Sequence, residues 1–408
     1  MHSIPKEWRW VKLGEVCHTT SGGTPSRREI KYYNGTIPWV KSGELDRGVI
    51  TDTEEKISEE AIKNSSAKIF PKGTLLIALY GATIGKLAFL GVDAATNQAI
   101  CGIYQNEKIS SSFLYNYLFY KKRKLVGQGI GGAQPNISQT ILKDLDIPLP
   151  PNPTQQAIVS KIEELFSELD KGLENLYLAQ QQLRTYRQAV LKWAFEGRLT
   201  NNNVKEGELP KDWKKVKLKE VSDSIQYGYT ESSSKEPIGP KFLRITDIQE
   251  NKVEWDEVPY CKIEKENVRK YLLKEGDLVF ARTGATVGKS FLIKGEIPEA
   301  VFASYLIRVR VNKEINEKYL SHFFHSPNYW SQITEGQVGI GQPNVNGTKL
   351  GQLDLVLVPI NEQDKIVQEI ESRLSVADKM EESITQSLQQ AEALRQSILK
   401  KAFEGRLL

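Results

Sequence analysis

LKWAFEGRL (191–199) returns near the end of the chain as LKKAFEGRL (399–407), with one residue changed. Three more segments recur in the same order: IPKEWRWVKLGEV (4–16) as LPKDWKKVKLKEV (209–221), GATIGK (81–86) as GATVGK (284–289), and QPNI (134–137) as QPNV (342–345). The offset between the copies stays between 203 and 208 residues, about half of the 408-residue chain. Two long copies indicate a tandem duplication, because a solenoid stacks many short repeats.

The composition is typical of a soluble globular protein, with 39% hydrophobic and 26% charged residues. The chain is long enough for two or more domains. It has no apolar run of about 18 residues, and its first ten residues lack the apolar segment of a secretory signal. The three cysteines, Cys17, Cys101 and Cys261, are far apart and form no zinc-binding pair. We therefore expect a reduced, cytoplasmic protein that has no contact with a membrane.

The first part of each copy, residues 1–152 and 209–360, mixes short β-rich runs with turns. TLLIALYG (74–81) and DLVFARTG (277–284) are examples of such runs, and Gly, Asn and Pro separate them. One helical stretch interrupts each part, at 111–124 and at 316–326. The pattern predicts two similar α+β globular domains.

The second part of each copy, residues 153–200 and 361–408, reads as one long helix, and a polar linker (201–208) follows the first. Apolar residues recur at alternating spacings of three and four, and Gly197 and Gly405 mark the helix ends. The register is weaker in the second copy, where Arg373, Ser387 and Lys401 interrupt it. The packing positions that we expect are Ile162, Leu165, Leu169, Leu176, Leu183, Val190, Ile370, Ala377, Ile384, Leu394 and Ile398.

Such apolar stripes need a partner, because water would otherwise cover them. Each helix could pack on its own domain. We favour packing of the two helices on each other, antiparallel, since the short linker returns the chain toward its start. The expected fold is therefore α+β, with two similar globular domains separated by two long antiparallel coiled-coil helices in a pseudo-two-fold repeat.

The net charge of +4 is unevenly distributed along the chain. Residues 1–152 carry +5 and residues 209–360 carry +2, whereas 153–208 carry −1 and 361–408 carry −2. Two similar domains with a positive excess suit DNA, on which related readers meet regularly spaced half-sites. KKRK (121–124) adds positive charge, although a solvated helix end explains it equally well.

The segments SGGTPSRREIKYYNGTIPWVKSGEL (21–45), GATIGK and GATVGK, the QPN turns and the two AFEGRL helix ends resemble the specificity subunits of Type I restriction-modification systems. The resemblance covers essentially the whole chain and includes the two-copy layout. It implies that each globular domain is a target recognition domain for one half of a split DNA sequence. The long helices would then hold the two domains apart and set the length of the unread spacer.

The resemblance also implies partners. Two modification subunits would dock on the chain and methylate adenine in double-stranded DNA, and restriction (motor-endonuclease) subunits would join them. The chain itself would perform no chemistry, so we expect S-adenosylmethionine, ATP and Mg²⁺ on the partner subunits and neither cofactor nor metal here.

Catalytic motifs are weak or incomplete, which agrees with that expectation. GATIGK has three residues between its glycines, where a phosphate-binding loop has four, and Leu87 stands where Ser or Thr would bind Mg²⁺. GQGIGG (127–132) matches a dinucleotide-binding pattern but follows a predicted helix instead of a strand. His322 and His325 are one helical turn apart, without a third ligand nearby. A nucleotide-hydrolysing enzyme is thus the weakest hypothesis, behind an adaptor with two protein-binding domains and no DNA.

Loops on a rigid domain are the expected place for side chains that read bases. An offset of 203 places Lys41, Ser42 and Glu44 opposite Arg244, Ile245 and Asp247, which makes these polar residues the leading candidates. We expect phosphate contacts from Thr83, Lys86, Thr286 and Lys289. The other candidates are Thr24, Arg27, Asn97, Gln98, Arg282, Ser304 and Tyr305.

Agreement between the copies favours a structural or backbone-binding role, and divergence favours target choice. Arg282 is a divergent position, since Tyr80 lies near its place in the first copy. The QPN turns, Gln134 with Asn136 and Gln342 with Asn344, occur in both copies. We therefore interpret them as turn-capping residues rather than base readers.

Overall fold

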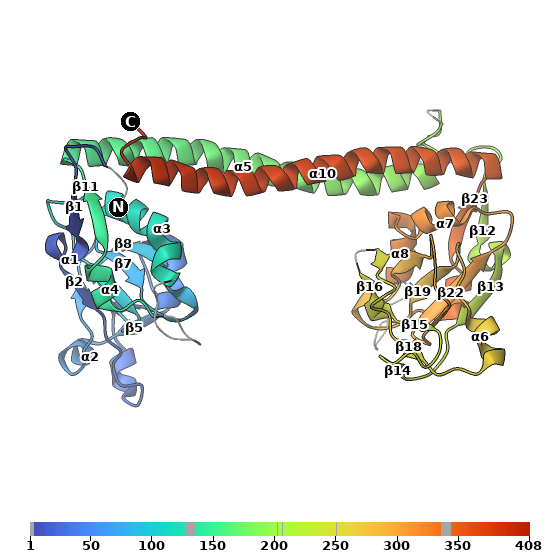
Figure 1. The fold of residues 1–408 in the computed structure, drawn as a ribbon, viewed down its shortest axis with the longest axis horizontal. Coiled ribbons are helices and arrows are strands. Elements are labelled where there is room, and N and C mark those ends of the chain that lie inside the picture. The colour runs from blue at the N-terminus through green and yellow to red at the C-terminus, as the bar shows by residue number, and fades with distance from the viewer. Residues whose placement is uncertain (1–3, 128–135, 202, 206, 250, 336–343) are drawn as a thin grey trace. The chain divides into compact units, whose positions relative to one another are not determined.

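A computed structural model describes residues 4–127, 136–201, 203–205, 207–249, 251–335 and 344–408 (Figure 1). The chain divides into two compact units. Unit 1 comprises Met1–Leu176 with Gln386–Leu408, and unit 2 comprises Tyr177–Thr385. Both divisions fall inside a long helix, so each unit contains part of each long helix.

Unit 1 contains one two-stranded sheet and two larger sheets. The two-stranded sheet pairs β1 (Arg9–Lys12) with β11 (Asp146–Leu149). The five-stranded sheet has the order β2 (Thr19–Ser21), β10 (Ile100–Ile103), β7 (Leu75–Ala78), β8 (Leu87–Leu90) and β4 (Val49–Ile50). The four-stranded sheet has the order β5 (Glu55–Ile57), β3 (Ile37–Val40), β9 (Ala94–Thr96) and β6 (Ile69–Phe70).

Short helices connect these strands. They are α1 (Leu13–Val16), η1 (Ile30–Tyr33), η2 (Ser42–Arg47), α2 (Glu59–Lys63), η3 (Gly81–Thr83), α3 (Ser111–Gly127) and α4 (Gln139–Lys143), where η marks a 3₁₀ helix. The run LLIA of β7 is buried at every position, which explains why its sequence shows no polar alternation. Helix α3 covers the sheet with Phe113, Leu114, Tyr117 and Leu118, residues that recur on one helical face.

Unit 2 repeats this plan. Strands β12 (Lys214–Lys217) and β23 (Asp354–Leu357) pair, and a four-stranded sheet has the order β13 (Ser222–Tyr227), β22 (Leu306–Val311), β19 (Leu278–Ala281) and β20 (Ser290–Leu292). A second four-stranded sheet has the order β14 (Ser233–Ser234), β18 (Tyr260–Cys261), β15 (Lys241–Leu243) and β21 (Ala300–Phe302). A hairpin joins β16 (Ile248–Gln249) to β17 (Lys252–Val253). The helices are η4 (Leu218–Val221), η5 (Ile245–Asp247), α6 (Lys265–Tyr271), η6 (Gly284–Thr286), α7 (Glu317–Phe323), α8 (Pro327–Glu335) and α9 (Gly347–Gly351).

Strand pairing confirms the duplication and the α+β prediction. The order β2-β10-β7-β8 in unit 1 matches β13-β22-β19-β20 in unit 2. Each unit also contains an equivalent parallel pair of strands, β3 with β9 in unit 1 and β15 with β21 in unit 2. The two copies therefore share a backbone framework as well as sequence motifs.

The long helices are α5 (Asn152–Phe195) and α10 (Ile360–Phe403), each with 44 residues. Gly197 and Gly405 follow them with φ values of +79° and +70°, as predicted for residues that end a helix. A Cβ at Gly405 would collide with Pro5, and one at Gly197 would collide with Pro210. Two of the repeated segments, AFEG and the Pro-Lys pairs at 5–6 and 210–211, thus pack against each other at each helix end, which gives a physical reason for their recurrence.

A buried glutamine ties the start of each long helix to its unit. Gln155 Nε2 donates to Pro150 O at 3.0 Å, and Gln363 Nε2 donates to Val358 O at 2.8 Å. Their Oε1 atoms accept from the backbone N–H groups of Ser110 (2.8 Å) and Asn316 (2.7 Å). Each helix therefore begins at a fixed point of the preceding domain.

The helices are antiparallel, as predicted. In unit 1 the Arg395 guanidinium of α10 pairs with Asp170 of α5 and lies 4.6 Å from the ring centroid of Phe166. In unit 2 Arg187 of α5 pairs with Asp378 and Glu381 of α10, at 2.7 and 2.8 Å. Later residues of one helix thus meet earlier residues of the other.

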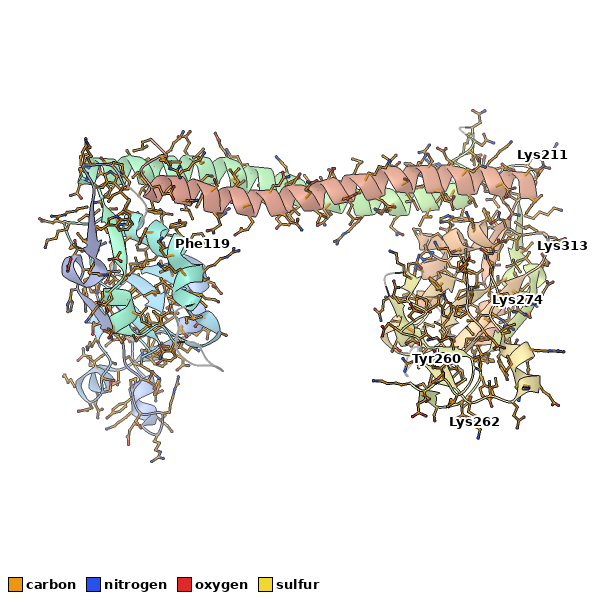
Figure 2. All side chains as sticks on the ribbon, in the orientation of Figure 1. Phe119, Lys211, Tyr260, Lys262, Lys274 and Lys313 are labelled. Atoms are coloured by element: carbon orange, nitrogen blue, oxygen red, sulfur yellow. The ribbon has the colours of Figure 1, made fainter. Side chains whose placement is uncertain are left out.

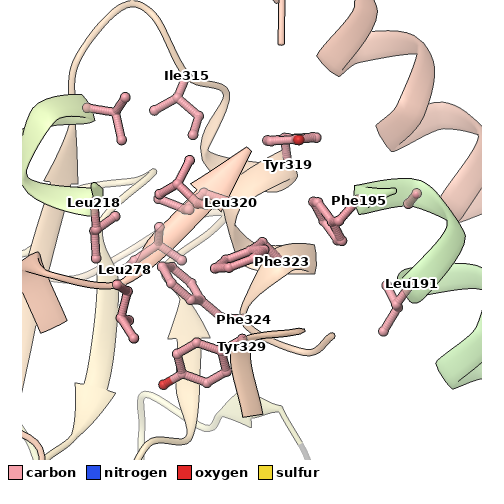
Figure 3. Close-up of a cluster of buried hydrophobic side chains, with 14 of the residues drawn as sticks. Leu191, Phe195, Leu218, Leu278, Ile315, Tyr319, Leu320, Phe323, Phe324 and Tyr329 are labelled. Atoms are coloured by element: carbon pink, nitrogen blue, oxygen red, sulfur yellow. The ribbon is translucent and has the colours of Figure 1, made fainter. Parts of the chain in front are cut away.

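The C-terminal end of each long helix packs into the domain of the other copy. Phe403 of α10 contacts Phe113 and Tyr117 of unit 1, with ring centroids 5.3 and 5.0 Å apart. Figure 3 shows the equivalent contact in unit 2, where Phe195 of α5 faces Tyr319 and Phe323 at 5.1 and 5.3 Å. The helices therefore pack both on each other and on the globular domains.

One predicted packing position is wrong. Leu394 is 51% exposed. On α10 the second inward-facing position lies four residues after each buried position of the heptad, whereas Leu394 lies three residues after the buried Ala391. The residues at these second positions are Leu374, Glu381, Leu388, Arg395 and Ala402. Two of these residues are charged and pair with α5, which disguised the register. The other predicted positions are buried or partly buried. Among the described helices, none is both long and apolar enough to span a bilayer.

Candidate functional site

The leading candidate segments form matching turns in the two units. The N–H of Lys41 donates to Glu44 Oε2 at 2.8 Å, and the N–H of Arg244 donates to Asp247 Oδ2 at 2.8 Å. These bonds cap the 3₁₀ helices η2 and η5 in the same way. The alignment at an offset of 203 is therefore confirmed at this point of the fold.

The two carboxylates mainly hold their own turns. Glu44 is 4% exposed, and its Oε1 accepts from the N–H of Glu54 at 3.0 Å. Asp247 is largely buried and forms an ion pair with the Arg244 guanidinium at 2.7 Å. These bonds already engage both oxygens of each carboxylate, so the geometry favours a structural role for Glu44 and Asp247.

Acidic neighbours engage the candidate cations of this part of unit 1. Lys41 Nζ lies 2.7 Å from Glu54 and 3.2 Å from Glu55. Arg27 binds Glu55 through both of its terminal nitrogens and stacks on Tyr33, 4.2 Å from the ring centroid. The hydrogen bond from Arg27 is the main cause of the lowered pKa of Glu55, and that from Lys41 adds to it. Ser42 is partly exposed beside this network.

The GATIGK and GATVGK loops are turns between antiparallel strands. They connect β7 to β8 and β19 to β20, and the N–H groups of Gly85 and Gly288 donate back to Ala78 O and Ala281 O at 2.8 and 2.9 Å. A phosphate-binding loop leads instead from a strand into a helix. The structure thus gives no geometric support for a nucleotide site here.

The two loop lysines have different surroundings. Lys86 Nζ forms an ion pair with Asp46, and only 27% of its side chain is exposed. Lys289 is exposed, and no described residue forms an ion pair with it. Thr83 and Thr286 are partly exposed in the same loops. Lys289 of unit 2 can therefore contact a phosphate directly, whereas Lys86 of unit 1 must first break its ion pair with Asp46.

The segment after each QPN turn pairs with the residues that precede the loop. Asn136 bridges Tyr80, and Asn344 bridges Thr283. The N–H of Ile137 donates to Leu79 O at 2.7 Å, and that of Val345 donates to Arg282 O at 3.0 Å. This shared pairing favours a structural role for Asn136 and Asn344. Gln134, Gln342 and residues 128–132 of the GQGIGG stretch lie outside the described residues.

The turns after β9 and β21 carry the next candidates, and Thr24, which follows β2, contacts the first of these turns. The Thr24 hydroxyl bonds Gln98 Oε1, and the N–H of Ala99 donates to Asn97 Oδ1 at 3.2 Å. In unit 2 the N–H of Ser304 donates to Tyr229 O at 2.8 Å, and Tyr305 is 63% exposed. Both turns thus present polar or aromatic side chains to solvent.

Backbone hydrogen bonds join these segments within each unit. The N–H of Asn97 donates to Val40 O, next to Lys41, and the N–H of Ala303 donates to Leu243 O, next to Arg244, each at 2.9 Å. The N–H of Leu79 donates to Ala99 O at 2.8 Å, and that of Arg282 donates to Tyr305 O at 3.0 Å. Three segments that are distant in sequence therefore form one candidate surface in each unit.

The same bonds define which residues of the two copies correspond. Asn97 corresponds to Ala303 and Gln98 to Ser304, at an offset of 206. The counterpart of Arg282 is Leu79, whereas Tyr80 corresponds to Thr283. The offset changes because unit 2 has three more residues between β19 and the turn.

The two neighbouring histidines, His322 in α7 and His325 just after it, do not form a metal site with other described residues. His325 Nδ1 lies 2.8 Å from Ser321 O, and burial lowers the pKa of His322 to about 4. The described residues include no cluster of three or more potential metal ligands. Figure 2 shows Lys262, Lys274 and Lys313 on the outer surface of this unit, where exposed lysines contribute positive charge.

The comparisons with known proteins agree with one another. Residues 5–176 and 210–392 match the family described as the Type I restriction modification DNA specificity domain. The chain is 24% identical to the specificity subunit of the Type I restriction enzyme EcoKI from Escherichia coli K12, over 99% of this chain and 90% of that protein. It is also 24% identical to the MjaVIII specificity subunit of Methanocaldococcus jannaschii, over 99% and 94%.

Two solved structures share the fold. One chain, from work on complex assembly and conformational transition of the type I R-M system, aligns over 100% of both chains with a TM-score of 0.80 and 21% identity. The HsdS subunit of Thermoanaerobacter tengcongensis aligns over 100% of this chain and 99% of its own, with a TM-score of 0.64 and 21% identity.

The chain belongs to the Type I restriction modification DNA specificity domain family. Its homologues are specificity subunits, so DNA target recognition is its class of function. This confirms the hypothesis drawn from the sequence, and nothing in these likenesses supports an adaptor that does not bind DNA.

Proposed function

We propose that each unit reads one half of a split target in double-stranded DNA. The observation that carries this proposal is the shared framework of the two candidate surfaces. Equivalent backbone hydrogen bonds hold both surfaces, but the side chains that they present differ, as at Leu79 and Arg282 or Gln98 and Ser304. Two readers with one scaffold and different side chains suit two different half-sites.

We further propose that α5 and α10 set the length of the unread spacer. Each helix is 44 residues long and contributes a part to each unit. At about 1.5 Å per residue, an insertion of four residues adds about 6 Å, nearly two base-pair steps of about 3.4 Å. Such an insertion beside Leu176 should lengthen the spacer that is recognised and leave both half-sites unchanged. An unchanged spacer in a folded variant would contradict this role.

The partners follow from the family. We propose that two methyltransferase (modification) subunits and the restriction (motor) subunits assemble with this chain. We also propose that this chain performs no catalysis, and that S-adenosylmethionine, ATP and Mg²⁺ bind to the partner subunits. The family membership supports this division of labour, and the hairpin geometry of the GATIGK and GATVGK loops agrees with it.

Duplex binding across a range of salt concentrations tests the proposed function. The full chain, with its modification subunits, should bind a duplex that carries its target and should lose affinity steeply as salt rises. Failure to bind any duplex at low salt with the partners present would overturn the proposal.

A further inference from the structure

The side chain of Arg282 has no anionic partner among the described residues. Its Nε is buried and has no hydrogen-bond acceptor there, and its guanidinium lies 5.0 Å from the ring centroid of Tyr227. Buried donors in folded proteins almost always find an acceptor. Arg282 is partly exposed and its two terminal nitrogens are not among the enclosed atoms, so these nitrogens can meet an acceptor that the described part of the chain does not supply.

The surroundings hold Arg282 in place. Its N–H donates to Tyr305 O and its carbonyl accepts from the N–H of Val345, both at 3.0 Å. The hydroxyl of Tyr227 accepts from the N–H of Gly347 at 2.8 Å, which fixes the ring under the guanidinium. Both ends of the stack are thus anchored to the backbone, so little conformational freedom is lost when the guanidinium meets a ligand.

Unit 1 uses the same framework differently. Leu79 occupies the place of Arg282, and its N–H and carbonyl make the equivalent bonds at 2.8 and 2.7 Å. Leu79 is 4% exposed, and Ala99 stands where unit 2 has the exposed Tyr305. Ser21 replaces Tyr227, as the equivalent pairings Ser21–Cys101 and Tyr227–Ile307 show, and its hydroxyl accepts from Gln139. An apolar, closed position in one unit is therefore a cationic and aromatic position in the other.

We propose that Arg282, stacked on Tyr227, reads a guanine in the half-site that unit 2 recognises; this rests on the proposed function. Two acceptors can receive two parallel N–H donors of an arginine on DNA: a phosphate, or O6 and N7 of guanine. A phosphate contact carries no sequence information, and the loop lysines Lys86 and Lys289, which both units share, are already the candidates for it. The replacement of Leu79 by Arg282 on an otherwise shared framework therefore favours the base. Tyr305, whose carbonyl accepts from the N–H of Arg282, is 63% exposed and would contact the neighbouring nucleotide.

The test selects binding sequences from duplexes randomised in both half-sites, with the full chain and its modification subunits. Arg282→Leu installs the side chain that unit 1 carries, and Arg282→Lys keeps the charge but loses the planar fork. Both variants should lose the preference for guanine at one position by about 10- to 100-fold, since a bidentate pair discriminates by that order. The half-site of unit 1 should stay unchanged, and so should the preference of the control Arg269→Leu, which removes an exposed charge from α6.

Three outcomes would overturn the inference. They are a uniform loss of affinity without relaxation at any position, full rescue of guanine preference by lysine, and unchanged selection by both variants. Thermal unfolding of each variant in its complex shows whether that variant is folded. Tyr305→Ala, which installs the residue that unit 1 has at the equivalent position (Ala99), gives a second readout at the adjacent base position. If the unchanged protein selects no sequence at all, the proposed function itself fails, which is a distinct result.

Discussion

Arg187 of α5 pairs with Asp378 of α10 at 2.7 Å, and the same pair recurs as Arg395 of α10 with Asp170 of α5. The two pairs are related by an offset of 208 residues for both partners. The duplication has therefore produced the same ion pair twice, with the arginine on α5 in one pair and on α10 in the other. A pair that occurs once in each unit is expected to fix the register of the antiparallel helices more than their stability.

Reversal of the charges tests this role. Arg187→Asp should destabilise unit 2 because it places like charges opposite each other, and Asp378→Arg in the same chain should restore most of the loss. The pair is partly exposed, so we expect a coupling free energy of at most about 1 kcal/mol. A double-mutant cycle by urea unfolding measures it, with the exposed Lys379→Ala as control. A coupling indistinguishable from zero would contradict a register role for this pair.

The aromatic residues at the helix ends are expected to matter far more. Phe195→Ala and Phe403→Ala each remove a buried ring from a packed cluster, which costs about 3–5 kcal/mol. Urea unfolding should show this loss for both variants. Leu178→Ala, at an exposed position of α5, should change the unfolding free energy by less than about 0.5 kcal/mol. Similar small effects at all three positions would show that the helix ends do not dock as described.

Lys289 and Lys86 should differ in their contribution to DNA binding. Lys289→Ala removes an exposed cation with no described ion-pair partner, so the slope of log K against log salt should fall by about 0.9 for every duplex tested. Lys86→Ala should have a smaller effect, because Asp46 already neutralises that lysine. Equal slopes for the two variants would contradict the asymmetry.

Burial of His322 makes unit 2 sensitive to acid. Its pKa is lowered from 6.5 to about 4, so the unfolded chain binds a proton there that the folded chain does not. The free energy of unfolding should therefore decrease as the pH falls from about 6.5 to about 4. His322→Gln should flatten this part of the urea-midpoint profile. A slope that survives His322→Gln would assign the effect to other groups.

The sequence predicted the duplication, both long helices and their ends, because glycine and proline signals and apolar periodicity act locally. It misplaced Leu394, since Glu381 and Arg395 occupy packing positions through ion pairs that a hydrophobic pattern does not reveal. It also offered Glu44 as a base reader, although burial gives that carboxylate a capping role.

Tyr227 was absent from the sequence-based candidates. Its only signal is the contrast between IQYGYT (225–230) and the equivalent TTSGGT (19–24), which needs the strand pairing to fix the offset. Long-range register thus decides which divergent residues face the same surface, and the sequence alone does not determine that register.

The methylated motif of a genome tests the central claim most directly. The chain is expressed with its modification subunits in a host without other adenine methyltransferases, and the same subunits without the chain serve as control. We predict adenine methylation within a two-part motif whose halves are separated by a gap of fixed length and free sequence. A continuous motif, or the same pattern without the chain, would contradict the account.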